Sequence, residues 1–120
     1  PLRRVRYLEL FRERNGCEWH DEPAVRAVAK RLGIAEHHGY PKLANDVFEA
    51  TCEAALEGVC FVVDYPIEIC PLAKASPDDP RVAERFELFV DGMEVANGFS
   101  ELNDPEEQER DQPEGGPDGP

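Results

Sequence analysis

Two glutamates, Glu87 and Glu94, lie on either side of the dipeptide Asp91-Gly92 in a run whose residue types could bind a cation. Asp-Gly between apolar-containing runs is a strong hairpin signal, because both turn residues must tolerate a positive φ. Pairing about this turn sets Glu87 opposite Ala96 and leaves the two glutamates as diagonal neighbours on one face, roughly 7 Å or less apart at Cβ. Like charges this close are unfavourable unless a cation, an ammonium group or solvent separates them.

The carboxylates and the residues that follow them offer two kinds of ligand contact. Carboxylate oxygens suit Mg²⁺, which commonly takes one or two carboxylates together with substrate phosphates and water. Asn97, Phe99 and Glu101 alternate, so in an extended chain their side chains point the same way. An amide, a ring and a carboxylate on one face suit a ligand with a carboxylate, methylenes and an ammonium group. From residue types alone, a solvent-exposed acidic hairpin explains the pattern equally well.

The spacing of Glu94 and Asn97 makes the shared pocket testable. They are three residues apart, so a flat strand puts them on opposite faces. If both serve one pocket, the ladder must slip by one residue between them, and we expect a bulge at Gly98 or within residues 96–98. A flat, unbroken ladder from Glu94 to Glu101 would rule the pocket out.

The segments before the hairpin predict an α+β fold, with amino-terminal helices packed on an incomplete antiparallel sheet. Three helices are expected over residues 7–15, 22–32 and 41–57, and a strand buried on both faces over residues 59–65. Prolines predict an extended segment at residues 66–70 and a loop at residues 77–80. We expect one domain over residues 1–112, ending in a short acidic helix from Pro105, and a disordered acidic Pro/Gly tail over residues 113–120.

Charge and cysteine content limit the function classes. The 120-residue chain has a formal net charge of −13, which argues against broad contact with nucleic-acid phosphates. No apolar run approaches the roughly 20 residues of a membrane span. Four scattered cysteines favour reduced thiols over a disulfide framework. We interpret three further sets of residues as ordinary surface or loop residues: the pair Glu49 and Glu53, the pair Cys17 and His20, and the pair His37 and His38.

The run ERFELFVDGMEVANGFSELND, with DYPIEICPLAK upstream, resembles the class II lysine–tRNA ligases, and weaker similarity extends over most of residues 1–110. The resemblance implies that Glu87 and Glu94 coordinate Mg²⁺ with the ATP phosphates. It also implies that Asn97 holds the lysine carboxylate, Phe99 lines the alkyl chain and Glu101 pairs with the ε-ammonium group. The family activates lysine with ATP to lysyl-adenylate and transfers it to tRNA in the cytoplasm.

Departures from the family pattern suggest an internal fragment of the catalytic domain. The 120 residues contain no FRNE run and no G-x-G-x-x-R run, which in the family supply two ATP-clamping arginines, and the dimer-forming motif of this homodimeric family is also missing. We therefore expect the isolated chain to be inactive. One alternative is a non-catalytic truncated paralogue or interaction module. Another is the related enzyme that adds lysine to elongation factor P, although Ser100 and residues 66–74 favour the tRNA ligase.

Overall fold

The computed structural model describes residues 2–36 and 39–101. The histidine pair at 37–38, the helix expected from Pro105, the domain boundary at residue 112 and the acidic tail all lie outside the described residues. The elements are β1 (Arg3–Arg6), α1 (Tyr7–Asn15), α2 (Glu22–Leu32), α3 (Tyr40–Thr51), the 3₁₀ turn η1 (Glu53–Ala55), β2 (Val59–Pro66), the 3₁₀ turn η2 (Ile67–Ile69), β3 (Val82–Val90) and β4 (Met93–Phe99).

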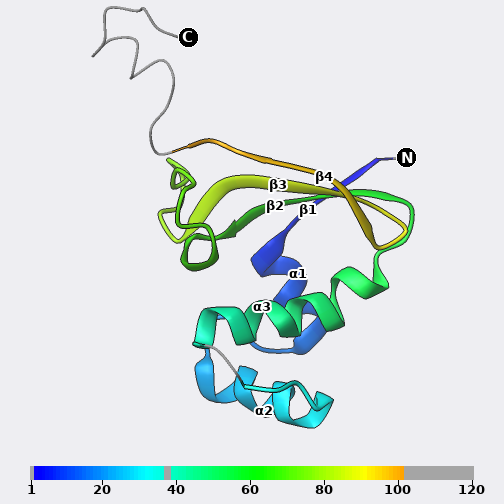
Figure 1. Ribbon diagram of the computed structural model, residues 1–120, viewed down its shortest axis with the longest axis vertical. Helices are drawn as coiled ribbons and strands as arrows, with labels where there is room; N and C mark the ends of the chain where they lie inside the picture. Colours follow the sequence, from blue (N-terminus) through cyan, green and yellow to red (C-terminus); the bar gives the residue numbers. More distant parts are fainter. Residues whose placement is uncertain (1, 37–38, 102–120) are drawn as a thin grey trace, which may run out of the picture.

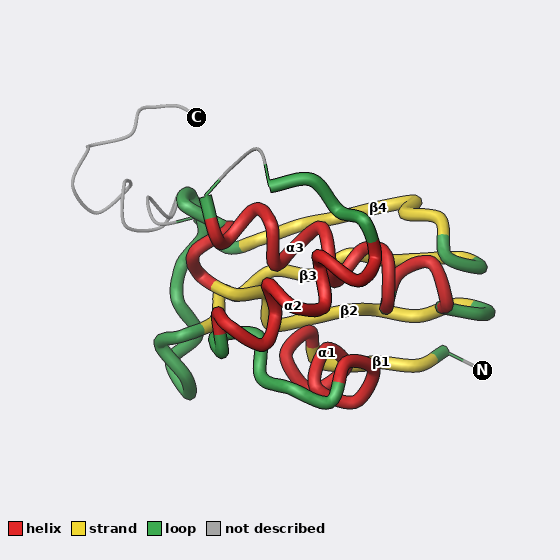
Figure 2. The backbone as a smooth tube through the Cα atoms, turned by 90° about the horizontal axis from the view of Figure 1, so that it is seen from below, coloured by secondary structure: helices red, strands yellow, loops and turns green. Residues whose placement is uncertain are grey.

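The four strands form one sheet in the order β1-β2-β3-β4, and the three helices lie on one side of it (Figure 1). Seen from that side, α3 crosses in front of the strands and α1 lies near β1 (Figure 2). The α+β class is confirmed. The sheet is mixed rather than purely antiparallel, because β1 pairs parallel with β2 while β2–β3 and β3–β4 are antiparallel.

Local sequence signals explain α1 and α2. Gly16 and Gly33 end these helices in the left-handed conformation, at φ 72° and 74°. That conformation is cheap for glycine, which has no Cβ. The side chain of Asp21 caps α2 by accepting a hydrogen bond from the Ala24 amide at 3.3 Å. Both helices therefore begin and end as predicted.

Two predicted segments differ from the structure. The third helix ends at Thr51 rather than near residue 57, and its path continues as the separate turn η1. Residues 66–70 are not wholly extended, because Ile67–Ile69 form a 3₁₀ turn closed by the Cys70 amide on the Ile67 carbonyl at 3.0 Å. A proline in front of a helical turn does not prevent it, since the lost N–H has no partner there.

The core lies between the helices and the sheet. Tyr7 of α1 stacks on Phe48 of α3 with ring centroids 3.7 Å apart, and Val62 and Phe89 close the core from the strands. The other face of the sheet is less covered by described residues, and Val59 there is 40% exposed. Val63 on the same face is 9% exposed, so the strand at residues 59–65 is buried on both faces towards its carboxyl end and not at Val59.

All four cysteines are free, and Cys52, Cys60 and Cys70 are buried, which confirms the prediction of reduced thiols. Among the described residues, no helix has the length and apolar character needed to cross a membrane.

Candidate functional site

The β3–β4 hairpin contains the predicted irregularity, but at a different residue. Phe89 pairs with Glu94 beside the turn, as a two-residue turn requires. One step further, Leu88 pairs with Ala96, so Val95 is an extra residue on β4. As a result Glu87 lies opposite Asn97, and its predicted pairing with Ala96 is wrong. The bulge precedes the expected position at residues 96–98.

This bulge returns Asn97 to the face that carries Glu94. Residues directly opposite in an antiparallel pair share a face, so Glu87, Glu94 and Asn97 all lie on the helix side of the sheet. The side-chain amide of Asn97 donates a hydrogen bond to Glu94 Oε2 at 2.9 Å. The flat ladder that would have ruled out a shared pocket is not present.

Glu87 and Glu94 line a cavity of about 630 Å³ between the hairpin and α3. The opposite wall holds Asn45, Glu49 and Glu53, which are spaced by four residues and so follow one face of the helix and its 3₁₀ extension. Glu49 is exposed, as the interpretation of an ordinary surface residue expects, whereas Glu53 is half-buried, and both line the cavity. Helical spacing was visible in the sequence, but the side of α3 that faces the sheet was not.

Burial and neighbouring negative charges raise the pKa values of two carboxylates of this cavity, Glu87 and Glu53. Glu87 is only 7% exposed, and burial raises its pKa, while the Arg85 guanidinium opposes that rise with a hydrogen bond of 2.6 Å. Burial, followed by the charge of Glu49, raises the pKa of Glu53 to about 7. Each negative charge here opposes the others, so the cavity favours a ligand that brings positive charge.

Arg85 and Tyr65 belong to the site and were missed by the sequence interpretation. The Arg85 guanidinium lies 5.0 Å from the centroid of the Tyr65 ring, and both residues line the cavity. Burial, followed by the charge of Glu87, raises the pKa of Tyr65 well above the ordinary value. Strand alternation could have found Arg85, which lies two residues before Glu87.

The three residues expected to contact lysine are distributed along the end of β4 and beyond. Asn97 contacts Glu94 of the large cavity. Phe99 lines an adjoining cavity of about 150 Å³, and Arg85 lines both cavities. Glu101 is exposed and pairs with Ala73 in an isolated antiparallel bridge. Asn97 thus lies with the two glutamates, Phe99 lines the adjoining smaller cavity, and Glu101 lies beyond the end of β4, in the bridge to Ala73.

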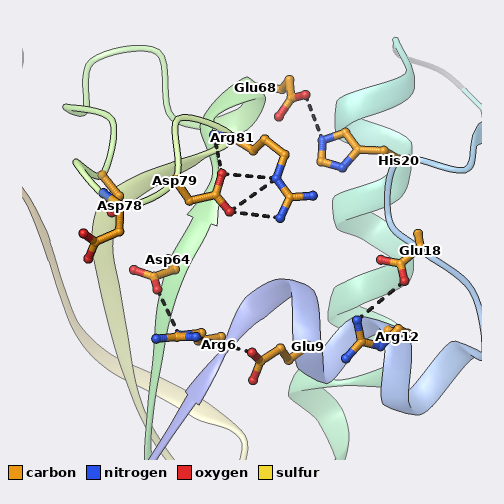
Figure 3. Close-up of polar contacts among 11 residues, drawn as sticks. Arg6, Glu9, Arg12, Glu18, His20, Asp64, Glu68, Asp78, Asp79 and Arg81 are labelled. Atoms are coloured by element: carbon orange, nitrogen blue, oxygen red, sulfur yellow. Dashed lines mark hydrogen bonds and ion pairs between the residues drawn. The ribbon is translucent and has the colours of Figure 1, made fainter.

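A set of ion pairs lies at the β1 side of the molecule, where β2, α1 and the loop after η2 meet (Figure 3). Arg81 pairs with Asp79 at 2.9 Å. His20, interpreted from sequence as a loop-packing residue, pairs with Glu68 at 3.0 Å. Because Glu68 also lines the large cavity, this contact links the α1–α2 loop to one wall of the site.

The donor set fits a divalent cation that takes its remaining oxygens from water or from a bound ligand. Within residues 2–36 and 39–101, no three His, Cys, Asp or Glu side chains are grouped so that they could hold a metal ion. Mg²⁺ bound through one or two carboxylates takes its other ligands from phosphates and water. Glu87 and Glu94, on one face of a cavity larger than an ion, suit that mode of binding.

Comparison with known proteins decides the family. Residues 1–116 match the family described as tRNA synthetases class II (D, K and N). The chain belongs to this family. Among curated proteins, this class II synthetase chain is 56% identical over 92 residues to the lysine–tRNA ligase of Azoarcus sp. (strain BH72), covering 77% of the chain and 18% of the relative.

Two other relatives carry the same name. The lysine–tRNA ligase of Thioalkalivibrio sulfidiphilus (strain HL-EbGR7) is 48% identical over 94 residues, covering 77% of the chain and 19% of the relative. That of Xanthomonas oryzae pv. oryzae (strain MAFF 311018) is 43% identical over 113 residues, covering 89% and 22%. The class II synthetase chain thus spans about a fifth of the length of these relatives.

Proposed function

We propose that this chain forms the lysine- and magnesium-binding part of the catalytic domain of a lysine–tRNA ligase. The proposed reaction is activation of lysine by ATP to lysyl-adenylate, followed by transfer to tRNA. We propose that it takes place in the cytoplasm. The observation that carries the proposal is the bulge at Val95, which places Glu87, Glu94 and Asn97 on one face beside an acidic cavity.

In this proposal Glu87 and Glu94 hold Mg²⁺. When bound, the ion neutralises negative charge on the ATP phosphates. The chain's own contribution is to fix its two carboxylates. Arg85 holds Glu87 Oε2 at 2.6 Å, and Asn97 holds Glu94 Oε2 at 2.9 Å, so each glutamate keeps its second oxygen for the cation.

Lysine would lie along the carboxyl end of β4. An amide nitrogen carries two hydrogens, so Asn97 can donate to Glu94 and to the lysine carboxylate at once. Phe99 lies alongside the methylenes, and Glu101 pairs with the ε-ammonium group. The smaller cavity at Phe99 has room for an aliphatic chain and is lined mainly by apolar residues from the loop after η2.

Lysine binding to the 120-residue chain, measured by calorimetry, tests these roles. We expect Glu101→Gln to weaken binding by about 10-fold or more, because a hydrogen bond to a charged group contributes about 1.5–3 kcal/mol. Glu57→Gln is the matched control, since Glu57 is exposed in the loop after η1 and lines neither cavity. Equal lysine affinity in wild type and Glu101→Gln would contradict the ammonium role.

Activity is proposed to need more than these residues. Since the 120 residues contain neither arginine run that the family uses to clamp ATP, we propose that they alone do not form lysyl-adenylate. Lysine-dependent ATP–pyrophosphate exchange by the isolated chain would refute this.

A further inference from the structure

Two residues near Glu87, Arg85 and Tyr65, have buried side-chain donors without a partner in the part of the chain that the structure describes. Arg85 donates to Glu87 Oε2, yet Arg85 Nε is buried without a hydrogen-bond partner among the described residues. The same is true of the hydroxyl of Tyr65, a residue that is only 2% exposed and lines the same cavity. Buried polar groups are nearly always paired in native proteins, so an unpaired donor beside a carboxylate needs a reason.

Tyr65 reaches this cavity because β2 departs from regular strand alternation just before it. Cys60 and Val62 face the helices, so regular alternation would turn Tyr65 to the opposite face. Between Val63 and Tyr65 the β2–β3 register shifts, and Asp64 adopts a positive φ of 59°. The change of alternation puts Tyr65 on the helix face, with its ring 4.9 Å from that of Tyr7.

The conformation of Asp64 is held by a contact of its own. Arg6 of β1 lies with Nε 3.4 Å from Asp64 Oδ2 (Figure 3). Residues other than glycine rarely adopt a positive φ, and such positions cluster where a site needs a particular geometry. As a result, the Tyr65 hydroxyl lies in the same cavity as Glu87, close enough for each group to shift the pKa of the other.

We infer that Tyr65 is a positioning residue for Glu87, donating a hydrogen bond from its hydroxyl to the carboxylate when Glu87 binds a divalent cation. Tyr65 contacts the metal-binding carboxylate and not the ion. Together with Arg85 it fixes which Glu87 oxygen faces the cavity. The inference rests on the proposed metal site at Glu87 and Glu94. Loss of such a supporting hydrogen bond typically weakens metal binding about 10- to 100-fold.

The test is Mn²⁺ binding to the 120-residue chain, followed by the electron paramagnetic resonance signal of free Mn²⁺, together with urea unfolding without metal. Tyr65→Phe keeps the ring against Tyr7 and Arg85. We expect it to bind Mn²⁺ at least about 10-fold more weakly, while its metal-free unfolding midpoint stays the same or rises because an unpaired buried hydroxyl is gone.

Two comparison variants separate the possible failures. Tyr40→Phe removes a tyrosine hydroxyl that donates to the Trp19 carbonyl away from the glutamates, and it should lower stability without changing Mn²⁺ affinity. Glu87→Gln should abolish binding. If Glu87→Gln binds Mn²⁺ as wild type does, the proposed metal site itself is wrong, and this inference fails with it. If Glu87→Gln loses binding but Tyr65→Phe keeps it, or if Tyr65→Phe destabilises the metal-free chain, the inference alone is overturned.

Discussion

The side-chain nitrogen of Asn97 lies 2.9 Å from Glu94 Oε2, although the two residues are three apart on one strand. In a regular strand such residues point to opposite sides. They meet because Val95 is left without a partner in the β3–β4 ladder. This bulge therefore brings Asn97, which we propose to contact lysine, onto the face of Glu87 and Glu94, which we propose to bind Mg²⁺.

Gly98 is expected to tolerate no side chain. A Cβ built at Gly98 would lie 2.7 Å from Cε2 of Phe86, its partner on β3. We predict that Gly98→Ala lowers the free energy of unfolding by about 1–3 kcal/mol, as overpacking usually does. Urea unfolding followed by circular dichroism measures this. In a Phe86→Ala background the same change should cost much less, and equal costs in both backgrounds would contradict the steric explanation.

The hairpin turn gives a second pair of glycine variants. Gly92 has φ 82°, and a Cβ there would lie 3.1 Å from the Glu53 carbonyl oxygen, whereas Gly58 has φ 69° with no atom within 4 Å of an added Cβ. Gly58→Ala should therefore lower the free energy of unfolding by about 1 kcal/mol, the cost of a positive φ for alanine. Gly92→Ala should lower the free energy of unfolding by about 2–3 kcal/mol, because the new Cβ also crowds the Glu53 carbonyl oxygen. Thermal unfolding of both variants checks the order, and a larger loss in Gly58→Ala would contradict it.

Glu53 predicts how stability depends on pH. Its pKa is raised from 4.5 to about 7, chiefly by burial and then by Glu49. Between these values the folded chain holds a proton that the unfolded chain has released, so the contribution of Glu53 to stability falls as pH rises from 4.5 to 7 and stays low above that. Glu53→Gln should remove this loss and be more stable than wild type at about pH 8, by roughly 1–3 kcal/mol.

The control for that measurement is Glu57→Gln, which changes the same net charge at an exposed position. Urea unfolding across the pH range should show the wild-type slope in this variant and a reduced slope in Glu53→Gln. Parallel curves for all three proteins would show that Glu53 is not responsible.

Tyr7 links the core to the cavity wall. It accepts a hydrogen bond from Trp19 Nε1 at 3.1 Å and donates one to Asn45 Oδ1 at 2.8 Å. Tyr7→Phe should cost about 1–3 kcal/mol, because the buried indole N–H loses its acceptor. Trp19 is the only tryptophan, so its fluorescence reports both unfolding and the local change. Tyr65→Phe, whose lost hydroxyl has no partner in the described structure, is the contrasting variant and should show no such loss.

Elements with local signals could be predicted from the sequence. Gly16 and Gly33 set the ends of α1 and α2, and Asp91-Gly92 set the hairpin turn, since each is required by the backbone conformation of its own neighbourhood. The end of α3 could not be predicted. Its apolar periodicity continues past Thr51, and no glycine or proline marks the change from α3 to the 3₁₀ turn η1.

The site shows the same limit. Strand alternation required a one-residue bulge between Glu94 and Asn97. The predicted position of the bulge, at Gly98 or within residues 96–98, was wrong because it relied on the glycine, and the extra residue is Val95. Gly98 is needed for the ring of Phe86, which lies against it, and not for a bulge. Tyr65 was hidden for a similar reason, because no local residue type marks the reversal at Asp64, whose side chain pairs with Arg6 of the distant strand β1.

The β3–β4 turn is tethered to the segment before β2. The Asp91 amide donates to the Gly58 carbonyl at 2.9 Å, and the Gly58 amide donates to the Asp91 carboxylate at 2.7 Å. Because the turn is anchored, the strands of the hairpin can separate more easily at the end away from the turn. Glu94 lies next to this anchored turn and Phe99 at the other end of β4, so the hairpin is more restricted in motion at Glu94 than at Phe99.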